Sequence, residues 1–317
     1  MIKPSIASNF LMNRFNQAVI LLITALFIAV IIFIPRFFEN HNDAPTSTKT
    51  PDNQIKLASE TSPVLNPEII GQAAIIWDRQ KKEVLYSKNS DQVRPIASIS
   101  KLMTAIIALD NLPPDYPIKI TATDLVVEGS SGLINGETWD LEDLVNYTLI
   151  VSSNDGTESL RRSTEEYTGS NFSELANSIK NKLDLSANSK WQNASGLDLI
   201  DGVEASNTAS ASDVIKLMDY LITTYPNSAL MTGEGQKIFT TNVKQHVANT
   251  TNQIYNTIPH TTAAKTGYTD VAGGNLVVVS EFGLNRPLYF VVLGSTVNGR
   301  FSDIESMYNS ASQALSD

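Results

Sequence analysis

The chain has 317 residues, of which 42% are hydrophobic, 18% are charged and none is cysteine, and its formal net charge at pH 7 is -10. It is long enough to bury a sizeable core, and the lack of cysteine excludes thiol catalysis, thiolate metal sites and disulfides. Because no basic cluster offsets the negative charge, no nucleic-acid partner is expected. No metal ion or organic cofactor is expected either, since no metal-ligand spacing occurs among the three histidines, His41, His246 and His260.

The first element along the chain is an apolar run at residues 18–34, in which Thr24 is the only polar side chain. This run is at the short end of what crosses a hydrocarbon core. Lys3 and Arg14 precede it, which favours a short cytoplasmic segment at residues 1–17 and an exported remainder. Because no small-x-small cleavage site follows, we expect an uncleaved, single-pass anchor in the cell membrane, with the rest of the chain on the extracytoplasmic side.

A polar segment and then a folded domain are expected after the anchor. Residues 39–67 are rich in Asn, Asp, Pro, Ser, Thr and Lys without an apolar period, which is typical of a flexible linker. Residues 68–317 form the predicted catalytic domain. At its start, β-prone runs at 73–77 and 83–87 flank the polar stretch 78–82 and predict a hairpin.

Helices are predicted for the middle of this domain. From Ile99, apolar side chains recur at helical spacing until Pro113 and Pro114, with Ser98 at the helix N-terminus. Further helical patterns, separated by turn residues, occupy 141–150, 159–167, 172–183 and 211–223.

Strand character returns near the end of the chain, at residues 263–266, 275–280 and 288–294. A capping box at Ser302–Glu305 predicts the start of a final helix. The order of strands, helices, strands and helix predicts an α+β domain whose sheet is assembled from both chain ends, with a helical subdomain packed beside it.

Three short motifs occur in one order in this domain: Ser98-Ile99-Ser100-Lys101, Ser152-Ser153-Asn154 and Lys265-Thr266-Gly267. They match the S-x-x-K, S-x-N and K-T-G boxes of serine acyl-transferases that use lysine as the base. A single S-x-x-K has little specificity, because this spacing is frequent on solvated helix faces. The ordered set of three predicts an active site.

Each residue type in these boxes has a chemical role. A serine hydroxyl needs a base within hydrogen-bond reach, and Lys101 shares a helix face with Ser98. Lys101 can act as a base only if its pKa falls well below about 10, which burial and a second cation such as Lys265 favour. Ser152 and Asn154 can supply a hydroxyl for proton transfer and an amide that holds Lys101.

The last box is predicted to bind substrate. Its strand offers an exposed edge to an extended peptide, and Gly267 leaves room for close backbone approach. We assign the two oxyanion donors to the backbone N–H groups of Ser98 and Tyr268. Ser153, between the two functional residues of its box, is expected to point away from the site.

Two of these segments carry a close family resemblance. Residues 96–105 and 265–273 resemble the nucleophile segment and the last box of the D-alanyl-D-alanine carboxypeptidases, the low-molecular-mass penicillin-binding proteins of serine peptidase family S11. Residues 193–197 and 249–252 are similar to further segments of that family, and the resemblance covers about Ile70 to Leu315. It implies a β-lactamase/transpeptidase-like fold with an antiparallel sheet.

The resemblance also implies a function. The enzyme would cleave the D-Ala-D-Ala bond of peptidoglycan stem peptides, and β-lactam antibiotics would acylate it as inhibitors. Ser98 would form the acyl-enzyme, Lys101 would accept its proton, and Ser152 with Asn154 would complete the proton network. The expected substrate-binding residues include Arg300, where the family often has an arginine that could hold the terminal carboxylate; they are Lys265, Thr266, Gly267, Tyr268 and Arg300.

The chain departs from the family pattern at three positions, which leaves fine specificity open. Ser153 stands where glycine is usual, Ala194 where proline is usual, and Tyr268 where some relatives have histidine. The sequence does not separate a carboxypeptidase from an endopeptidase that cleaves D-Ala-containing cross-links, because both use the same machinery.

Two further alternatives are a class A β-lactamase and an inactive wall-binding homologue. A class A β-lactamase needs an added glutamate to activate the deacylating water, and Glu165 and Glu166 follow the second box too closely for that role. An inactive wall-binding homologue is disfavoured, because every expected catalytic residue is present.

Overall fold

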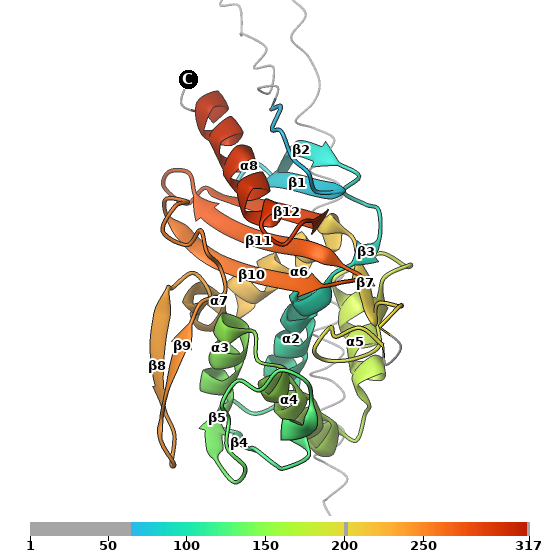
Figure 1. Ribbon diagram of the computed structural model, residues 1–317, viewed down its shortest axis with the longest axis vertical. Coiled ribbons are helices and arrows are strands. Elements are labelled where there is room, and N and C mark those ends of the chain that lie inside the picture. Colours follow the sequence, from blue (N-terminus) through green and yellow to red (C-terminus); the bar gives the residue numbers. More distant parts are fainter. Residues whose placement is uncertain (1–64, 200–201, 316–317) are drawn as a thin grey trace, which may run out of the picture. The chain divides into compact units, whose positions relative to one another are not determined.

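The computed structural model describes residues 65–199 and 202–315. Its central element is a five-stranded antiparallel sheet that joins strands from both ends of this region (Figure 1). The order β10-β11-β12-β1-β2 is formed by β1 (Ala73–Asp78), β2 (Glu83–Lys88), β10 (Thr261–Thr269), β11 (Gly273–Glu281) and β12 (Pro287–Ser295). The predicted hairpin and the assembly of the sheet from both chain ends are confirmed.

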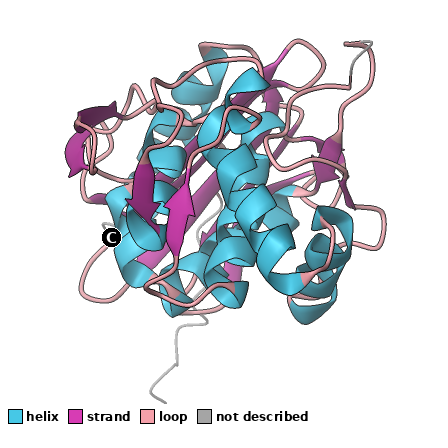
Figure 2. Cartoon of the chain, turned by 90° about the horizontal axis from the view of Figure 1, so that it is seen from below, coloured by secondary structure: helices cyan, strands magenta, loops and turns pink. Residues whose placement is uncertain are grey.

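Alternate residues of the strands enter two separate cores. Val277 and Val291 belong to the core shared with the middle helices, whereas Val278 and Val292 pack with Ile304 of the last helix. This alternation follows from the two-residue period of a strand. Because both faces are covered, the central strands read as continuous Val, Leu and Phe runs. Figure 2 shows the surrounding helices from below.

The middle region is helical, as predicted. It contains α2 (Lys101–Asn111), α3 (Leu141–Val151), α4 (Asn154–Thr168), α5 (Phe172–Lys182), α6 (Ala211–Thr224) and α7 (Pro226–Met231), and α8 (Gly299–Leu315) follows the last strand. Leu102, Ile106 and other apolar residues of α2 are fully buried. Helix α2 therefore provides a rigid base for the residues that precede it.

Short strands pair outside the main sheet. They are β3 (Arg94–Pro95), β7 (Asn207–Ala209) and β6 (Lys190–Trp191) in one sheet, β4 (Pro117–Lys119) with β5 (Thr138–Asp140), and β8 (Gln236–Thr240) with β9 (Gln245–Asn249). The chain after β9 is tied to the main sheet, because the hydroxyls of Thr251 and Thr266 lie 2.6 Å apart.

Two predicted helix starts were wrong. Helix α4 begins at Asn154 and not at residue 159, because Ser153 caps it by accepting the N–H of Gly156. Helix α8 begins at Gly299, whose N–H donates to the hydroxyl of Thr296, so Ser302–Glu305 is not a capping box.

The carboxylate of Asp303, assigned by sequence to that capping box, has a different role. It accepts the N–H groups of Ile70 and Gly71 and the hydroxyl of Ser295, at 2.6 to 2.9 Å. Asp303 therefore joins the segment before β1 to the end of β12. A tertiary partner has replaced the local one that the sequence pattern suggested.

The predicted anchor at residues 18–34 and most of the predicted linker lie outside the described residues. Within residues 65–199 and 202–315, none of the helices combines the length and the apolar character needed to cross a bilayer. Leu65 is buried in the core beneath α8, so packing against the domain already begins there.

Candidate active site

The predicted nucleophile lies on a short turn that leads into α2. Ala97–Ser100 form a single 3-10 turn, and Ala97 has a φ of +48°, in the left-handed region. This turn places the Ser98 hydroxyl oxygen 2.8 Å from the Nζ of Lys101, which is the first residue of α2. The i, i+3 geometry expected from the sequence is therefore present.

Lys101 is completely buried and surrounded by oxygen acceptors. Its Nζ lies 2.8 Å from Ser98 Oγ, 2.7 Å from Asn154 Oδ1 and 2.8 Å from the backbone carbonyl oxygen of Ser195. Burial lowers the pKa of Lys101 to about 7, although the negative charges of Glu158 and Asp155 act in the opposite direction. Near neutral pH a large fraction of Lys101 is thus a free amine, the form that can accept a proton.

A second buried lysine, Lys265, lies beside Ser152. Lys265 is 1% exposed, and its Nζ donates to Ser152 Oγ at 2.9 Å and to the carbonyl oxygen of Thr266 at 2.8 Å. Burial, followed by the positive charges of Lys101 and Arg300, lowers the pKa of Lys265 well below its ordinary value.

The second box joins two helices. Ser152 ends α3 with φ 60° and ψ 42°, and Asn154 begins α4. Ser153, between them, is buried and donates to Asp155 Oδ1 at 2.5 Å. The Ser153 hydroxyl is therefore engaged with Asp155. Asn154 uses its amide oxygen for Lys101 and donates Nδ2 to the carbonyl oxygen of Glu128 at 2.7 Å, so its orientation is fixed.

A loop that sequence reasoning missed is held against this box. Ser131 donates its N–H and its hydroxyl to the buried carboxylate of Asp155, at 3.1 and 2.5 Å. The hydroxyl of Tyr147 donates to the carbonyl oxygen of Ser131 at 2.6 Å. The Ser-Ser-Asn-Asp pattern was visible in the sequence, but the partner of Asp155 lies 24 positions earlier in the chain.

Gly267 contacts the nucleophile turn itself. A Cβ there would lie 2.7 Å from the carbonyl oxygen of Ile96 and 3.1 Å from the backbone nitrogen of Ile99. Gly196 is similarly close, since its Cβ would lie 2.0 Å from the carbonyl oxygen of Ala97. The absence of a side chain at Gly267, which the sequence pattern associates with close approach of substrate backbone, is therefore already needed for the nucleophile turn to pack against β10.

The remaining predicted residues lie along the end of β10. Arg300 donates Nη1 to the carbonyl oxygen of Gly267 at 2.8 Å, so it is adjacent to the last box. Tyr268 is 44% exposed, and its hydroxyl donates to Asp270 at 2.8 Å. The assignment of the Ser98 and Tyr268 N–H groups as oxyanion donors stays a prediction.

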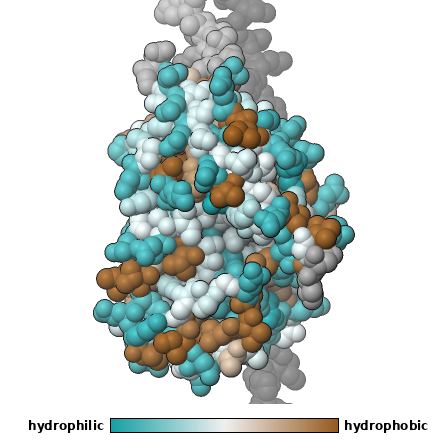
Figure 3. All heavy atoms as spheres, in the orientation of Figure 1, coloured by the Kyte–Doolittle hydropathy of each residue, from teal (hydrophilic) through white to brown (hydrophobic). Residues whose placement is uncertain are grey.

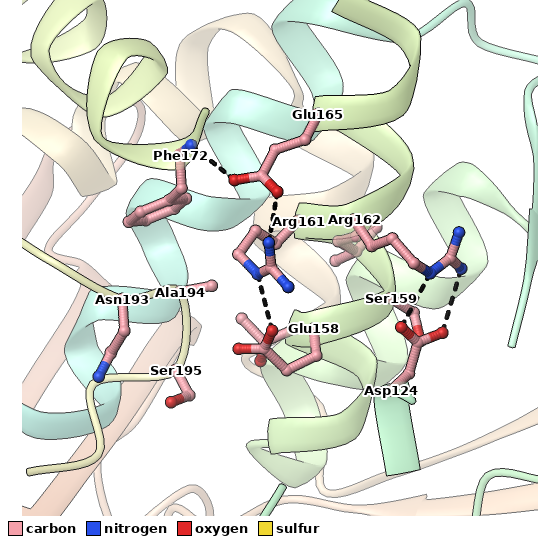
Figure 4. A network of polar contacts seen from close by, with 12 residues as sticks. Asp124, Glu158, Ser159, Arg161, Arg162, Glu165, Phe172, Asn193, Ala194 and Ser195 are labelled. Atoms are coloured by element: carbon pink, nitrogen blue, oxygen red, sulfur yellow. Dashed lines mark hydrogen bonds and ion pairs between the residues drawn. The ribbon is translucent and has the colours of Figure 1, made fainter. Parts of the chain in front are cut away.

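A charged network extends along α4 (Figure 4). Glu158 follows Asn154 by one helical turn and accepts from Arg161 Nε at 2.7 Å. Arg161 also binds Glu165, which accepts the N–H of Phe172 at 2.7 Å. The pattern of the three boxes gave no signal for Glu158, although helical spacing from Asn154 places it on the same face.

The two glutamates considered for a lactamase are engaged elsewhere. Glu165 holds Arg161 and the start of α5, and Glu166 accepts from Arg162 at 2.9 Å. In the described part of the chain, no three His, Asp or Glu side chains gather into a group that could hold a metal ion.

Comparison with known proteins shows the family to which the chain belongs. Residues 59–297 match the family described as D-alanyl-D-alanine carboxypeptidase, peptidase S11. The chain is 29% identical over 252 residues to the D-alanyl-D-alanine endopeptidase of Escherichia coli K12, covering 77% of each chain. It is 31% identical over 238 residues to the protein of the same name from Pseudomonas aeruginosa, covering 72% of this chain and 73% of that one.

A solved structure shares the fold. Penicillin-binding protein D2 of Listeria monocytogenes, determined in its ampicillin-bound form, is 30% identical with a TM-score of 0.66, covering 77% of this chain and 98% of that one. The α+β transpeptidase-like domain implied by the sequence resemblance is confirmed. With its family matched over most of the domain, the chain belongs to peptidase family S11 and is a serine-type DD-peptidase.

Proposed function

We propose that this enzyme is an endopeptidase that cleaves D-alanine-containing cross-links of peptidoglycan, and that the same residues can release terminal D-alanine. The observation that carries the chemistry is the buried amine of Lys101, 2.8 Å from Ser98 Oγ. The similarity to two proteins named D-alanyl-D-alanine endopeptidase favours cross-links as the main substrate. The family description supports carboxypeptidase activity as the second candidate.

Acylation begins with the neutral form of Lys101. Its Nζ accepts the Ser98 hydroxyl proton while Oγ attacks the carbonyl carbon of the penultimate D-alanine. The N–H groups of Ser98 and Tyr268 stabilise the oxyanion that forms. Asn154 and the Ser195 carbonyl oxygen hold the resulting ammonium in place through the hydrogen bonds that they already make.

Collapse of this intermediate breaks the carbon–nitrogen bond. The leaving nitrogen takes a proton from the Ser152 hydroxyl, which Lys265 orients and which regains a proton from the ammonium of Lys101. Arg300 places positive charge near the carboxylate of the leaving group, and Lys265 adds a hydrogen-bond donor there. Water then attacks the Ser98 ester, with Lys101 again as base, and the product acid leaves.

The test uses the full chain in detergent, with a cross-linked muropeptide dimer and a pentapeptide monomer as substrates. We expect mass spectrometry to find cleavage of the dimer by the wild-type chain, and release of D-alanine from the monomer at a lower rate than this cleavage. Ser98→Ala should give neither product. A fluorescent penicillin should label the wild-type chain and not this variant. Release of D-alanine without dimer cleavage would favour the carboxypeptidase, and the absence of both products would contradict the whole proposal.

The anchor at residues 18–34 is part of this proposal, and the supporting observation is its uninterrupted apolar sequence. We expect the full chain to remain in membranes after alkaline washing and to be accessible to protease only from outside. Leu26→Arg should move it to the soluble fraction, because a charge at the bilayer centre costs about 2.5 to 3.5 kcal/mol on insertion scales. Alkaline extraction of the unchanged chain would refute the anchor.

A further inference from the structure

An open cleft adjoins the second box and is not used by the mechanism above. Its volume is about 390 Å³. It is lined by the loop at 129–131, by Tyr147 of α3 and the junction of α3 and α4 at 151–154, and by Val247 with Asn249 on β9. Ser152 and Asn154 are part of this lining, whereas Ser98 and Lys265 are not. The cleft therefore extends the active site beyond Ser152, away from the nucleophile.

The cleft opens at the corner where the leaving group must lie. Ser152 Oγ is held by Lys265, and the chain after β9 leads to Thr251, whose hydroxyl is 2.6 Å from that of Thr266. The wall formed by β9 is thus attached to β10, the strand that carries Lys265. A leaving nitrogen that takes its proton from Ser152 has its substituents at the entrance of this cleft.

The size of the cleft exceeds the needs of a small leaving group. Free D-alanine has only a methyl group as its side chain, which is far smaller than a cleft of about 390 Å³. In a cross-link, the leaving amino acid has a side chain that continues through an amide into a second stem peptide. A substituent of that kind is long enough to occupy the space between the loop at 129–131 and β9.

The chemical character of the lining also fits a long, amide-containing substituent. It combines neutral hydroxyl and amide groups, such as Ser130 and Asn249, with the apolar surface of Val151 and Val247, and it contains no charged side chain. Figure 3 shows apolar side chains on the face where the β8–β9 hairpin lies, and Val247 is 51% exposed. This mixture fits an aliphatic chain interrupted by amides better than a charged group.

The walls of the cleft are fixed before any substrate arrives. Asp155 holds Ser131 through two hydrogen bonds, and Tyr147 holds its carbonyl oxygen. Asn154 fixes the carbonyl oxygen of Glu128 at the other end of the loop. A preformed wall reduces the ordering cost of binding a flexible peptide.

We propose that this cleft is a subsite for the leaving half of a cross-link, where it binds the uncharged side-chain stem that joins the two peptides. The inference rests on the proposed endopeptidase function and names the surface that would distinguish a cross-link from a terminal D-alanine. Val247 and Ser152 both line it.

The test compares two substitutions in the same hairpin. Val247→Trp would fill the cleft, while Val243→Trp is the matched control, because Val243 is also a 51% exposed valine and does not line it. Each full chain in detergent receives the muropeptide dimer and the pentapeptide monomer. We expect Val247→Trp to lower the ratio of dimer cleavage to D-alanine release about tenfold or more, and Val243→Trp to leave the ratio unchanged.

The outcomes separate the two proposals. Unchanged labelling of both variants by fluorescent penicillin would show that the nucleophile is intact. If the wild-type chain cleaves the dimer and Val247→Trp does so at the same ratio, the subsite is refuted and the endopeptidase stands. If the wild-type chain does not cleave the dimer, the endopeptidase is refuted and this use of the cleft with it.

Discussion

Gly267 of the last box packs directly against Ile96, the residue that leads into the nucleophile turn. A β-carbon on Gly267 would lie 2.7 Å from the Ile96 carbonyl oxygen, closer than such atoms approach in proteins. The K-T-G strand and the S-x-x-K turn are therefore positioned by mutual contact. The glycine of this box has a structural task that precedes any contact with substrate.

Gly267→Ala should consequently misplace Ser98. The added methyl group meets backbone atoms, which cannot rotate away, and such overpacking costs typically about 1 to 3 kcal/mol. We expect the second-order rate of labelling by fluorescent penicillin to fall about tenfold or more. A labelling rate equal to that of the unchanged chain would show that the turn can move without loss, and would contradict the positioning role.

The pKa of Lys101 predicts the pH dependence of acylation. Burial lowers this pKa to about 7, and only the neutral amine accepts the Ser98 proton. The acylation rate should therefore rise with pH, with a midpoint near 7, and fall about tenfold per unit below it. Stopped-flow labelling between pH 5 and pH 9 measures the profile. A rate that is flat through this range would mean that another group is the base.

The charge of Glu158 should move that midpoint. Its negative charge raises the pKa of Lys101 and so favours the protonated amine. Glu158→Gln removes the charge at nearly constant volume, and the midpoint of the acylation profile should shift to lower pH. The measurement is the same labelling series as for the unchanged chain.

The control for this shift is Glu166→Gln. Glu166 lies on the same helix, and its partner is Arg162. Loss of its charge should leave the midpoint in place, even if the helix becomes less stable. A lower rate with an unmoved midpoint in Glu158→Gln would assign Glu158 a purely structural role.

Local sequence patterns predicted the main architecture and the site because both are encoded in short periods and fixed spacings. The strand runs have a two-residue or fully apolar pattern, and Ser98 and Lys101 meet simply because they are one helical turn apart. The Ser-Ser-Asn-Asp sequence was both a functional box and a helix start. In the structure these two interpretations describe one arrangement, since Ser153 caps the helix that carries Asn154.

The features that escaped prediction depend on contacts between distant segments. The Ser195 carbonyl oxygen binds Lys101 from 94 positions away, and the clash that requires Gly267 involves a turn far earlier in the chain. The local periodicity of apolar residues contains no information about contacts between such distant segments. Likewise, the capping box at Ser302 failed because the carboxylate of Asp303 has stronger tertiary partners than its own helix offers.

Asp303 supports a last prediction, on stability. Its buried carboxylate accepts three hydrogen bonds that join the segment before β1, the end of β12 and α8. Asp303→Ala leaves two backbone N–H groups and a hydroxyl without this acceptor, and each buried group left unpaired costs about 1 to 3 kcal/mol. We expect a clearly lower midpoint of thermal unfolding, with the pH midpoint of acylation unchanged because Asp303 is not among the charges that act on Lys101. Asp115→Ala, at an exposed position, is the control and should alter neither quantity. A fully stable Asp303→Ala chain would show that water or neighbouring groups replace the carboxylate.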